Sequence, residues 1–446
     1  MSATSGSHAA LLQLRPPAAL AAAVRPPGSK SLTNRALLLA SLAQGRSRLS
    51  GVLDADDTRW MRRCVERLGV EVADRGPAAL EVEGRARAFT APTGEGPLYA
   101  GSAGTVARFL TAVIAARPGL ARAPIELDAS AQLRARPIAQ LLDALREQGA
   151  DIRCLAEPGF LPIAIGPGSR LRGGDVEFAR PASSQIVSAM LLAASFSEKP
   201  TRVLLREGTP ARPYVEMTIR MLEHFGGCAH WIDERAIAVE PRALEARACV
   251  IEPDASSASY FLGLAAIHGG EVAVPGLGSE SLQGDAHFCR VLEQMGARVE
   301  QSRAITRVRG GSTLRGVDCD LGGMPDMTLT LAVAALFAEG PTQIRGVEVL
   351  RHHESDRLAA AATELRKLGA RVEERADGLR IDPPRAGPTR GVEIDCYDDH
   401  RMAMAFAMVG DVVIRDPGCV AKTFPDYFRE LERLGMVAGA PPAARC

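Results

Sequence analysis

Residues 365–372, LRKLGARV, carry the pattern that decides the fold: the end of an amphipathic helix, a glycine and a short strand. A helix commonly ends in a left-handed residue, and glycine adopts that conformation without a steric penalty. Similar stretches recur along the chain and place the glycine at Gly69, Gly149, Gly226, Gly296, Gly369 and Gly435. One such junction is common in any α/β protein, but six at intervals of 66 to 80 residues indicate six homologous units. Units of this length are too long for a solenoid, so we expect two domains of three units each.

A second pattern lies inside the units, where a polar turn containing Gly, Ser or Asp runs directly into an apolar helix. It occurs at residues 28–31, 101–105, 183–185, 254–257, 325–328 and 398–401. The first backbone N–H groups of a helix lack partners, and the helix dipole adds partial positive charge there. Helix starts gathered around a cleft would therefore bind an anion. Simple helix capping explains any one of these turns taken alone.

The composition is typical of a packed soluble protein and excludes some classes of function. The 446 residues suffice for two or three domains, with 46% hydrophobic and 24% charged residues. Lys plus Arg and Asp plus Glu both number 53, which argues against a protein that coats nucleic acid or an anionic membrane. The apolar runs are too short to span a bilayer. The nine cysteines form no CxxC pair or metal-ligand cluster, so we expect reduced thiols and a cytoplasmic protein. Residues 1–23 predict a frayed start followed by an edge strand.

Charged and hydroxyl side chains gather at the first helix start. Ser31 and Arg35 lie four residues apart on one predicted helix face, and Lys30 stands at the turn. These groups suit a phosphate or a carboxylate, and the alternative is a solvated basic helix end.

The stretch 351–357, RHHESDR, is also dense in charge and precedes an Ala-rich helix. Glu354 and Arg357 are three residues apart, which fits a functional site or a capping box with surface ion pairs. The chain has no G-x-x-x-x-G-K-[ST] phosphate loop and no G-x-S-x-G nucleophile elbow, so ATP binding and this kind of hydrolysis have little support.

Several strings resemble signatures of the 5-enolpyruvylshikimate-3-phosphate synthase family. They are residues 27–35 (PGSKSLTNR), 101–105 (GSAGT), 354–357 (ESDR), 399–404 (DHRMAM) and 421–428 (AKTFPDYF). The resemblance implies an α/β fold of two similar domains, each of three βαβαββ units (an inside-out α/β barrel), with the active site in the interdomain cleft. It implies one discontinuous domain of residues 1–25 and 253–446, and an inserted domain of residues 26–252.

The resemblance also implies an activity. The 5-hydroxyl of shikimate 3-phosphate would add to C2 of phosphoenolpyruvate, and the tetrahedral intermediate would eliminate phosphate, with no metal or organic cofactor. The implied catalytic residues are Asp326 as base for the hydroxyl, Glu354 as proton partner of the methylene carbon, and Lys30. The residues implied for shikimate 3-phosphate are Lys30, Ser31, Arg35, Ser183, Ser184, Gln185, Tyr214, Asp326 and His353. Those implied for phosphoenolpyruvate are Lys30, Gly104, Thr105, Arg136, Gln185, Arg357, His400, Arg401 and Lys422.

Four positions depart from the family pattern. His353 stands where the family usually has lysine, Gln132 where many members have a phosphoenolpyruvate-binding arginine, Ala211 where serine is common, and Val349 where the residue is polar. We expect Arg136, with Arg134 behind it, to replace the missing arginine. Gly104 keeps the small residue beside which glyphosate would bind, so we expect inhibition by glyphosate.

The sequence also bears on three other functions. The sister enzyme that acts on UDP-N-acetylglucosamine uses a cysteine in the loop that corresponds to residues 128–137, and this loop has none. A paralogue with another hydroxylated ring acid is more plausible, because His353, Ala211 and Val349 fall on the acceptor side. A non-catalytic binder of an anionic metabolite has no need of acid–base pairs. We expect a monomer, because six such units can bury their apolar faces within one chain.

Overall fold

The structure is a computed structural model that describes residues 10–86, 89–116, 123–311 and 313–438. It divides into two compact units, each with its own hydrophobic core. Unit 2 consists of Pro27–Asp254 with Leu282–Gly284, and unit 1 of Met1–Pro26, Ala255–Ser281 and Asp285–Cys446. The domain bounds expected from the sequence, residues 1–25 with 253–446 and residues 26–252, stay a prediction.

Unit 2 contains three segments with one order of elements: strand, helix, strand, helix and hairpin. The first is built from β14 (Ala248–Val250), α1 (Lys30–Leu42), β3 (Gln44–Ser50), α2 (Asp56–Arg67), β4 (Glu71–Asp74) and β5 (Ala79–Arg85). The second is β6 (Leu98–Tyr99), α3 (Gly104–Ala115), β7 (Ile125–Asp128), α4 (Ala131–Arg134), α5 (Ala139–Glu147), β8 (Ile152–Cys154) and β9 (Ile163–Ile165). The third is β10 (Gly174–Phe178), α6 (Ser184–Ala194), β11 (Thr201–Leu205), α7 (Arg212–His224), β12 (Cys228–Asp233) and β13 (Ala236–Glu240).

Unit 1 repeats this order, with its N-terminal strands inserted into later sheets. Its first segment is β2 (Ala21–Ala23), α8 (Ala255–His268), β15 (Gly270–Pro275), η1 (Gly284–His287), α9 (Phe288–Gln294), β16 (Arg298–Gln301) and β17 (Ile305–Gly310). Its second is β18 (Leu314–Arg315), β19 (Asp318–Asp320), η2 (Pro325–Met327), α10 (Thr328–Ala335), β20 (Ala338–Glu339), β21 (Thr342–Arg345), η3 (Glu348–His352), α11 (Arg357–Lys367), β22 (Arg371–Arg375) and β23 (Gly378–Asp382). Its third is β24 (Val392–Ile394), α12 (His400–Phe406), η4 (Ala407–Val409), β25 (Val412–Arg415), η5 (Pro417–Lys422), α13 (Tyr427–Arg433) and β1 (Leu11–Gln13).

Apart from the two-stranded sheet β18-β20, the sheets of the described residues share one topology, which supports the six-unit interpretation. In the sheet β10-β11-β13-β12 the first two strands are parallel and the hairpin pairs antiparallel to β11. Four further sheets have the same pattern, and the sixth, β1-β25-β24, is completed by β1. Both β1 and β2 lie at sheet edges, which confirms the edge strand predicted near the N-terminus.

The six repeated glycines have the backbone that their position requires. Their φ angles lie between +74° and +111°. The helices α2, α5, α7, α9, α11 and α13 end just before them. A side chain is disfavoured at such φ values, which explains why glycine marks all six junctions.

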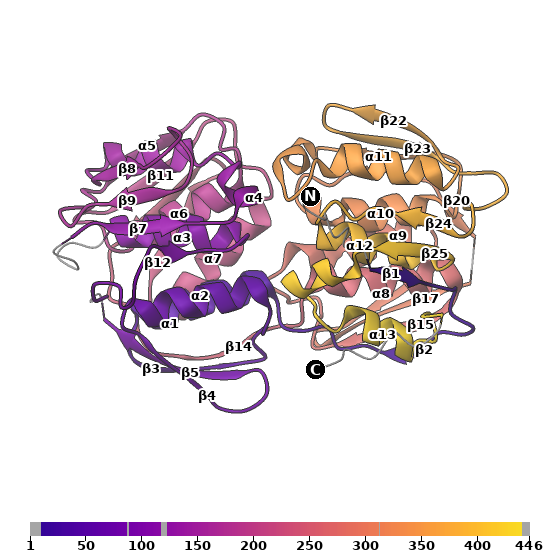
Figure 1. The fold of residues 1–446 in the computed structure, drawn as a ribbon, viewed down its shortest axis with the longest axis horizontal. Coiled ribbons are helices and arrows are strands. Elements are labelled where there is room, and N and C mark those ends of the chain that lie inside the picture. The colour runs from indigo at the N-terminus through magenta and orange to yellow at the C-terminus, as the bar shows by residue number, and fades with distance from the viewer. Residues whose placement is uncertain (1–9, 87–88, 117–122, 312, 439–446) are drawn as a thin grey trace, which may run out of the picture. The chain divides into compact units, whose positions relative to one another are not determined.

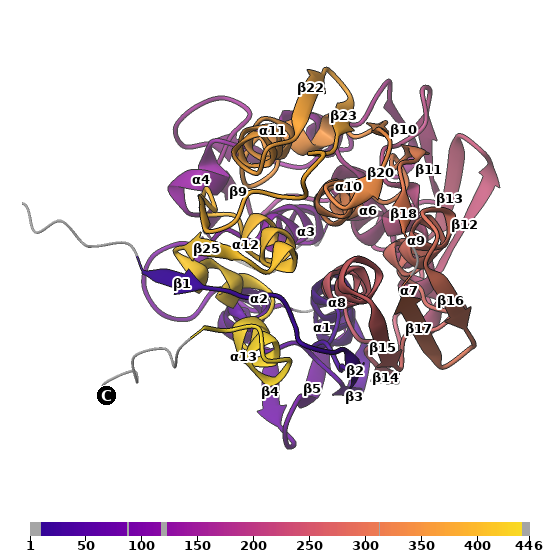
Figure 2. The ribbon, with the colours of Figure 1, turned by 90° about the vertical axis from the view of Figure 1, so that its right-hand side faces the viewer.

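The other helix of each segment is almost wholly buried, because apolar residues dominate it after its first turns. In unit 2, α1, α3 and α6 lie inside and the sheets lie outside (Figure 1). In unit 1, α8, α10 and α12 hold the central position (Figure 2). These six helices begin at the six polar turns, so the predicted helix starts are confirmed.

Candidate functional site

In unit 1 the candidate residues gather where helices begin. Asp326 lies in η2 immediately before α10, Arg357 is the first residue of α11, and His400 and Arg401 open α12. Lys422 ends η5, which follows the next strand. The helix α10 packs against both α11 and α12, which brings these chain segments together.

Arg357 is the centre of this cluster and is only 1% exposed. Its Nη1 donates to Asp326 Oδ1 at 3.0 Å, and its Nη2 donates to Glu354 Oε2 at 2.8 Å. Asp399, which is fully buried, accepts from Nε at 2.8 Å and from Nη2 at 3.1 Å. The three carboxylates offset the buried positive charge and fix the plane of the guanidinium.

Two further cations share these carboxylates. Arg401 Nη2 donates to Asp326 Oδ2 at 2.7 Å, and Lys422 Nζ donates to Glu354 Oε1 at 3.0 Å. Arg401 Nη1 also lies 3.4 Å from the hydroxyl of Tyr260. Burial raises the pKa of Tyr260 to about 12, so this hydroxyl stays protonated at neutral pH.

The cluster shifts the titration of its own members. Burial alone would raise the pKa of Asp326, but the positive charges of Arg401 and Arg357 outweigh it and hold the pKa well below its usual range. Burial would lower the pKa of Arg357, yet Asp399, Glu354 and Asp326 raise it. Both groups are therefore charged at neutral pH.

His353 adjoins the same arginine. Its Nδ1 lies 3.0 Å from Arg357 Nη1 and 3.9 Å from Asp326 Oδ1. Because a guanidinium only donates, Nδ1 accepts and the ring proton is on Nε2. His353 is therefore a neutral hydrogen-bonding group in this arrangement. His400 is 1% exposed, with its Nδ1 3.7 Å from Asp399 Oδ1.

In unit 2, Arg35 is buried among neutral groups. Its guanidinium donates to the hydroxyls of Thr218 (2.8 Å) and Ser188 (3.3 Å) and to the carbonyls of Ser31 (2.9 Å) and Tyr214 (3.1 Å). In the described part of the chain no carboxylate forms an ion pair with it. Burial lowers the pKa of Arg35 to about 10, so the buried positive charge is kept at neutral pH.

A second group in unit 2 surrounds Gly104 at the start of α3. Arg108, one turn later and buried, donates to Gln185 Oε1 at 3.0 Å. A Cβ at Gly104 would lie 2.6 Å from Arg108 Nη1, 3.0 Å from Gln185 Oε1 and 3.5 Å from Arg136 Nη1. A side chain at position 104 would therefore clash with Arg108, and glycine allows two guanidinium groups to lie close to this helix start. The buried Nε of Arg136 has no hydrogen-bond partner among the described residues.

Neighbouring contacts join these two groups. Asn34, next to Arg35, donates from Nδ2 to Thr105 Oγ1 at 2.9 Å. Ser183 caps α6 and accepts from the backbone N–H of Gln185 at 3.2 Å. Ser184 is buried at the first position of α6.

Other predicted residues lie apart from these contacts. Lys30 pairs with Asp57 at 3.0 Å. Arg134 pairs with Asp128 at an exposed position and is not among the three described side chains nearest to Gly104. Ala211 is the N-cap of α7, with φ +49°, and Val349 lies in η3.

Sequence reasoning missed four contributors: Asp57, Arg108, Tyr260 and Asp399. Asp399 lay within the quoted string DHRMAM, so a carboxylate before two basic residues was an available signal. Arg108 follows Gly104 by one helical turn, which was a second signal. Nothing in the sequence separates Asp57 from its neighbour Asp56.

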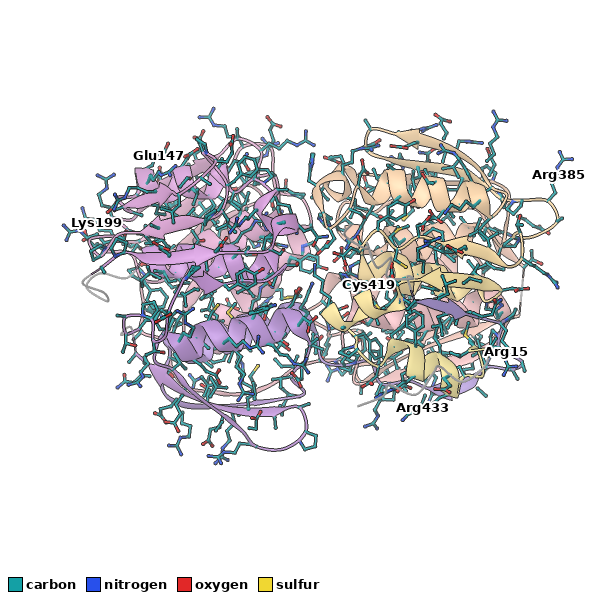
Figure 3. All side chains as sticks on the ribbon, in the orientation of Figure 1. Arg15, Glu147, Lys199, Arg385, Cys419 and Arg433 are labelled. Atoms are coloured by element: carbon teal, nitrogen blue, oxygen red, sulfur yellow. The ribbon has the colours of Figure 1, made fainter. Side chains whose placement is uncertain are left out.

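Most other charged side chains point away from the two cores. Glu147 and Lys199 extend outward from unit 2, and Arg385 from unit 1 (Figure 3). Within the described residues, no helix is long and apolar enough to cross a membrane. The eight described cysteines are all free thiols, and Cys446 lies outside the described residues.

Comparisons with known proteins agree over nearly the whole chain. Residues 14–431 match the sequence profile of the family described as EPSP synthase (3-phosphoshikimate 1-carboxyvinyltransferase). A protein of that name from Photobacterium profundum is 43% identical over 434 residues, covering 96% of this chain and 99% of its own length. One from Bordetella petrii is 42% identical over 431 residues, covering 93% and 94%.

Solved structures give the same result for the fold. The EPSP synthase of Acinetobacter baumannii superimposes with a TM-score of 0.81 at 27% identity, covering 96% of this chain and 99% of that one. The enolpyruvyl transferase NikO from Streptomyces tendae shares the fold, with a TM-score of 0.76 at 19% identity and coverage of 97% and 99%. The expected fold of two similar α/β domains, each of three βαβαββ units, is thereby confirmed, and the chain belongs to the EPSP synthase family.

Proposed function

We propose that the chain transfers the enolpyruvyl group of phosphoenolpyruvate to the 5-hydroxyl of shikimate 3-phosphate and releases phosphate. The observation that carries this proposal is the family match over residues 14–431. Relatives about as long as this chain and more than 40% identical to it bear the name of that transferase. This favours shikimate 3-phosphate over a different hydroxylated acceptor and over a non-catalytic binder.

The phosphoenolpyruvate anion would bind Arg357, Arg401 and Lys422 in unit 1. Asp326 and Glu354 hold these three side chains by hydrogen bonds. A phosphate or carboxylate oxygen would replace one carboxylate at a time, so the cations need little rearrangement. This replacement would release the carboxylates of Asp326 and Glu354 from the cations, so that they can accept or donate a proton. His400 would support this group, and Gly104, Thr105, Arg136, Gln185 and Lys30 would supply further contacts from unit 2.

The reaction needs one proton acceptor and one proton donor in its first step. Asp326 would accept the 5-hydroxyl proton as the hydroxyl oxygen bonds to C2 of phosphoenolpyruvate. Glu354, once protonated, would give its proton to the methylene carbon, which becomes a methyl group. In the second step the bond from C2 to the phosphate oxygen breaks, and the leaving phosphate takes the bonding electrons and the proton held by Asp326. The methyl group returns a proton to Glu354, which restores the double bond. Lys30 and Lys422 would stabilise the charge that develops.

Shikimate 3-phosphate would bind mainly through unit 2. Its charged groups suit Lys30, Ser31, Arg35, Ser183 and Ser184, with Gln185 and Tyr214 beside them. Support comes from Arg35, a buried cation whose present partners are all neutral. Such a cation gains from a bound anion. Asp326 and His353 would contact the acceptor from unit 1.

The test is phosphate release from phosphoenolpyruvate by purified protein, with and without shikimate 3-phosphate, between pH 6 and 9. We expect release only with both substrates. Asp326→Asn should lower kcat by about 100-fold or more, in the range of a lost acid–base residue. The exposed Glu147→Gln is the matched control and should match the parent protein. Binding of both substrates without release would contradict the proposal and favour the non-catalytic binder.

Glyphosate provides a second check on the phosphoenolpyruvate site. The absence of a side chain at Gly104, beside Arg108 and Arg136, leads us to expect inhibition that phosphoenolpyruvate relieves. A dose–response series at two phosphoenolpyruvate concentrations measures this. A flat response at high glyphosate would contradict it.

We also propose that the protein works in the cytoplasm as a monomer, without nucleic-acid or membrane partners. The equal numbers of acidic and basic residues and the separate core of each unit support this proposal. Light scattering behind a sizing column measures the mass, for which 47.2 kDa is expected. Twice that mass would contradict the monomer.

A further inference from the structure

Asp57 forms a buried ion pair with Lys30. The Nζ atom of Lys30 lies 3.0 Å from Asp57 Oδ2, and the side chains are 17% and 4% exposed. The neighbouring helices α1 and α2 lie side by side in unit 2 (Figure 1), and each contributes one residue from its first turn. Asp57 is therefore withdrawn from solvent in a position that faces a proposed catalytic residue.

The electrostatics of the two helix starts favour this pair. Lys30 is the first residue of α1, whose first turn has no acidic residue, so the helix dipole repels its ammonium group. Asp57 lies in the first turn of α2, where the dipole stabilises a carboxylate. The carboxylate therefore offsets an unfavourable location for the lysine.

Threonines at both helix starts fix the carboxylate in place. The backbone N–H of Leu53 donates to Thr33 Oγ1 of α1 at 3.1 Å. Thr58 Oγ1 donates to the carbonyl of Leu53 at 2.8 Å and accepts from the N–H of Ala55 at 3.1 Å. Both threonines are buried, so the turn before α2 is tied to α1. Asp57 consequently has little freedom relative to Lys30.

We propose that Asp57 is a positioning residue, which holds the Lys30 ammonium group in the direction that catalysis requires. This inference rests on the proposed function, because Lys30 is assigned there to substrate binding and charge stabilisation. Asp57 itself need not touch either substrate. Its contribution should disappear when Lys30 is absent.

The matched variants are Asp57→Asn and Asp56→Asn. Asp56 is the adjacent residue of the same first turn, and its side chain is 55% exposed. We expect Asp57→Asn to lower kcat by about 10- to 100-fold, the cost of a small misplacement of a catalytic group. Asp56→Asn should leave kcat unchanged. A melting curve for each variant separates loss of folded protein from loss of rate.

A double-mutant cycle with Lys30→Met tests whether Asp57 acts through the lysine. We expect Asp57→Asn to have no further effect on kcat/KM in the Lys30→Met background. A loss of the same size in both backgrounds would overturn the inference, because Asp57 would then act through another group or through stability alone.

A measurement on the substrate-free protein separates this inference from the proposed function. A lysine side chain held against a buried carboxylate is less accessible to a succinimidyl ester than one that is released from it. Mass spectrometry should show faster acylation of Lys30 in Asp57→Asn but not in Asp56→Asn. Equal rates would refute the ion pair. A parent protein that releases no phosphate would refute the proposed function whatever the acylation rates are.

Discussion

Asp399 accepts hydrogen bonds from the Arg357 guanidinium with both carboxylate oxygens, at 2.8 Å and 3.1 Å, and both side chains are almost completely buried. The same carboxylate accepts from the backbone N–H of Arg401 at 3.0 Å and from the hydroxyl of Ser355 at 3.1 Å. One residue thus caps α12 and orients an arginine of α11. The Asp399 side chain therefore positions two of the cations proposed for phosphoenolpyruvate, Arg357 through its guanidinium and Arg401 through its backbone N–H.

Replacing this carboxylate should destabilise the fold. Asp399→Asn keeps the shape but leaves the buried Arg357 with less compensation, and the expected loss is about 3 kcal/mol of unfolding free energy. Denaturant unfolding measures it. The neighbouring Asp398→Asn is the control, since Asp398 is exposed and its φ of +53° suits asparagine. Its effect should stay within about 0.5 kcal/mol, and equal losses in the two variants would contradict the assignment.

The depressed pKa of Asp326 predicts a dependence of stability on acid pH. A carboxyl group whose folded pKa is lowered stabilises the protein fully above the unfolded value of about 3.9, and this contribution is lost as pH falls towards the folded pKa. The stability difference between the parent protein and Asp326→Asn should therefore be constant from pH 5 to 8 and shrink below pH 4. Denaturant unfolding at each pH measures it.

The exposed pair of Asp318 and Arg345 provides the comparison for this pH series. Asp318→Asn should change the unfolding free energy by less than about 1 kcal/mol at any pH. A difference between the parent protein and Asp326→Asn that persists unchanged at pH 3 would show that the carboxylate is not the group responsible.

The fold was predictable because its signals are local. A glycine at each of six junctions needs a positive φ, and the sequence spacing of these glycines reveals the repeat without any tertiary information. The helix starts were predictable for the same reason. The entry of β14 into the first sheet of unit 2 was not, because a three-residue edge strand carries no periodic signal of its own.

The site residues were predictable only where a charged side chain is unusual for its position in the sequence. Lys30, Arg357 and Arg401 stand out as charges beside apolar helices. Asp57 and Asp56 are the same residue type in the same helical turn, and only the packing of α2 against α1 makes one buried and the other exposed. Burial differences of this kind come from long-range contacts, which cannot be inferred from the pattern of neighbouring residues in the sequence.

The arginine that replaces the one missing at position 132 can be identified by a matched pair of variants. Arg136 Nη1 lies 3.5 Å from where a Cβ of Gly104 would be, whereas Arg134 is paired with Asp128 at the surface. Arg136→Gln should raise KM for phosphoenolpyruvate by about 10- to 100-fold, the cost of one charged hydrogen bond. Arg134→Gln should change it by less than about 3-fold. A larger effect from Arg134→Gln would reverse the assignment.

The hydrogen bond between Arg357 and His353 predicts how the histidine behaves with pH. Nδ1 accepts from the guanidinium at 3.0 Å, so adding a proton to that atom would cost the bond and place two positive charges together. We therefore expect a neutral imidazole to serve where the family usually has lysine. His353→Gln keeps a neutral hydrogen-bonding group, and its kcat/KM for shikimate 3-phosphate should stay within about 3-fold of the parent value, less than one hydrogen bond is worth. The two pH profiles should run parallel from pH 6 to 8. A rise towards pH 6 in the parent protein alone would mean that a charged His353 binds the acceptor.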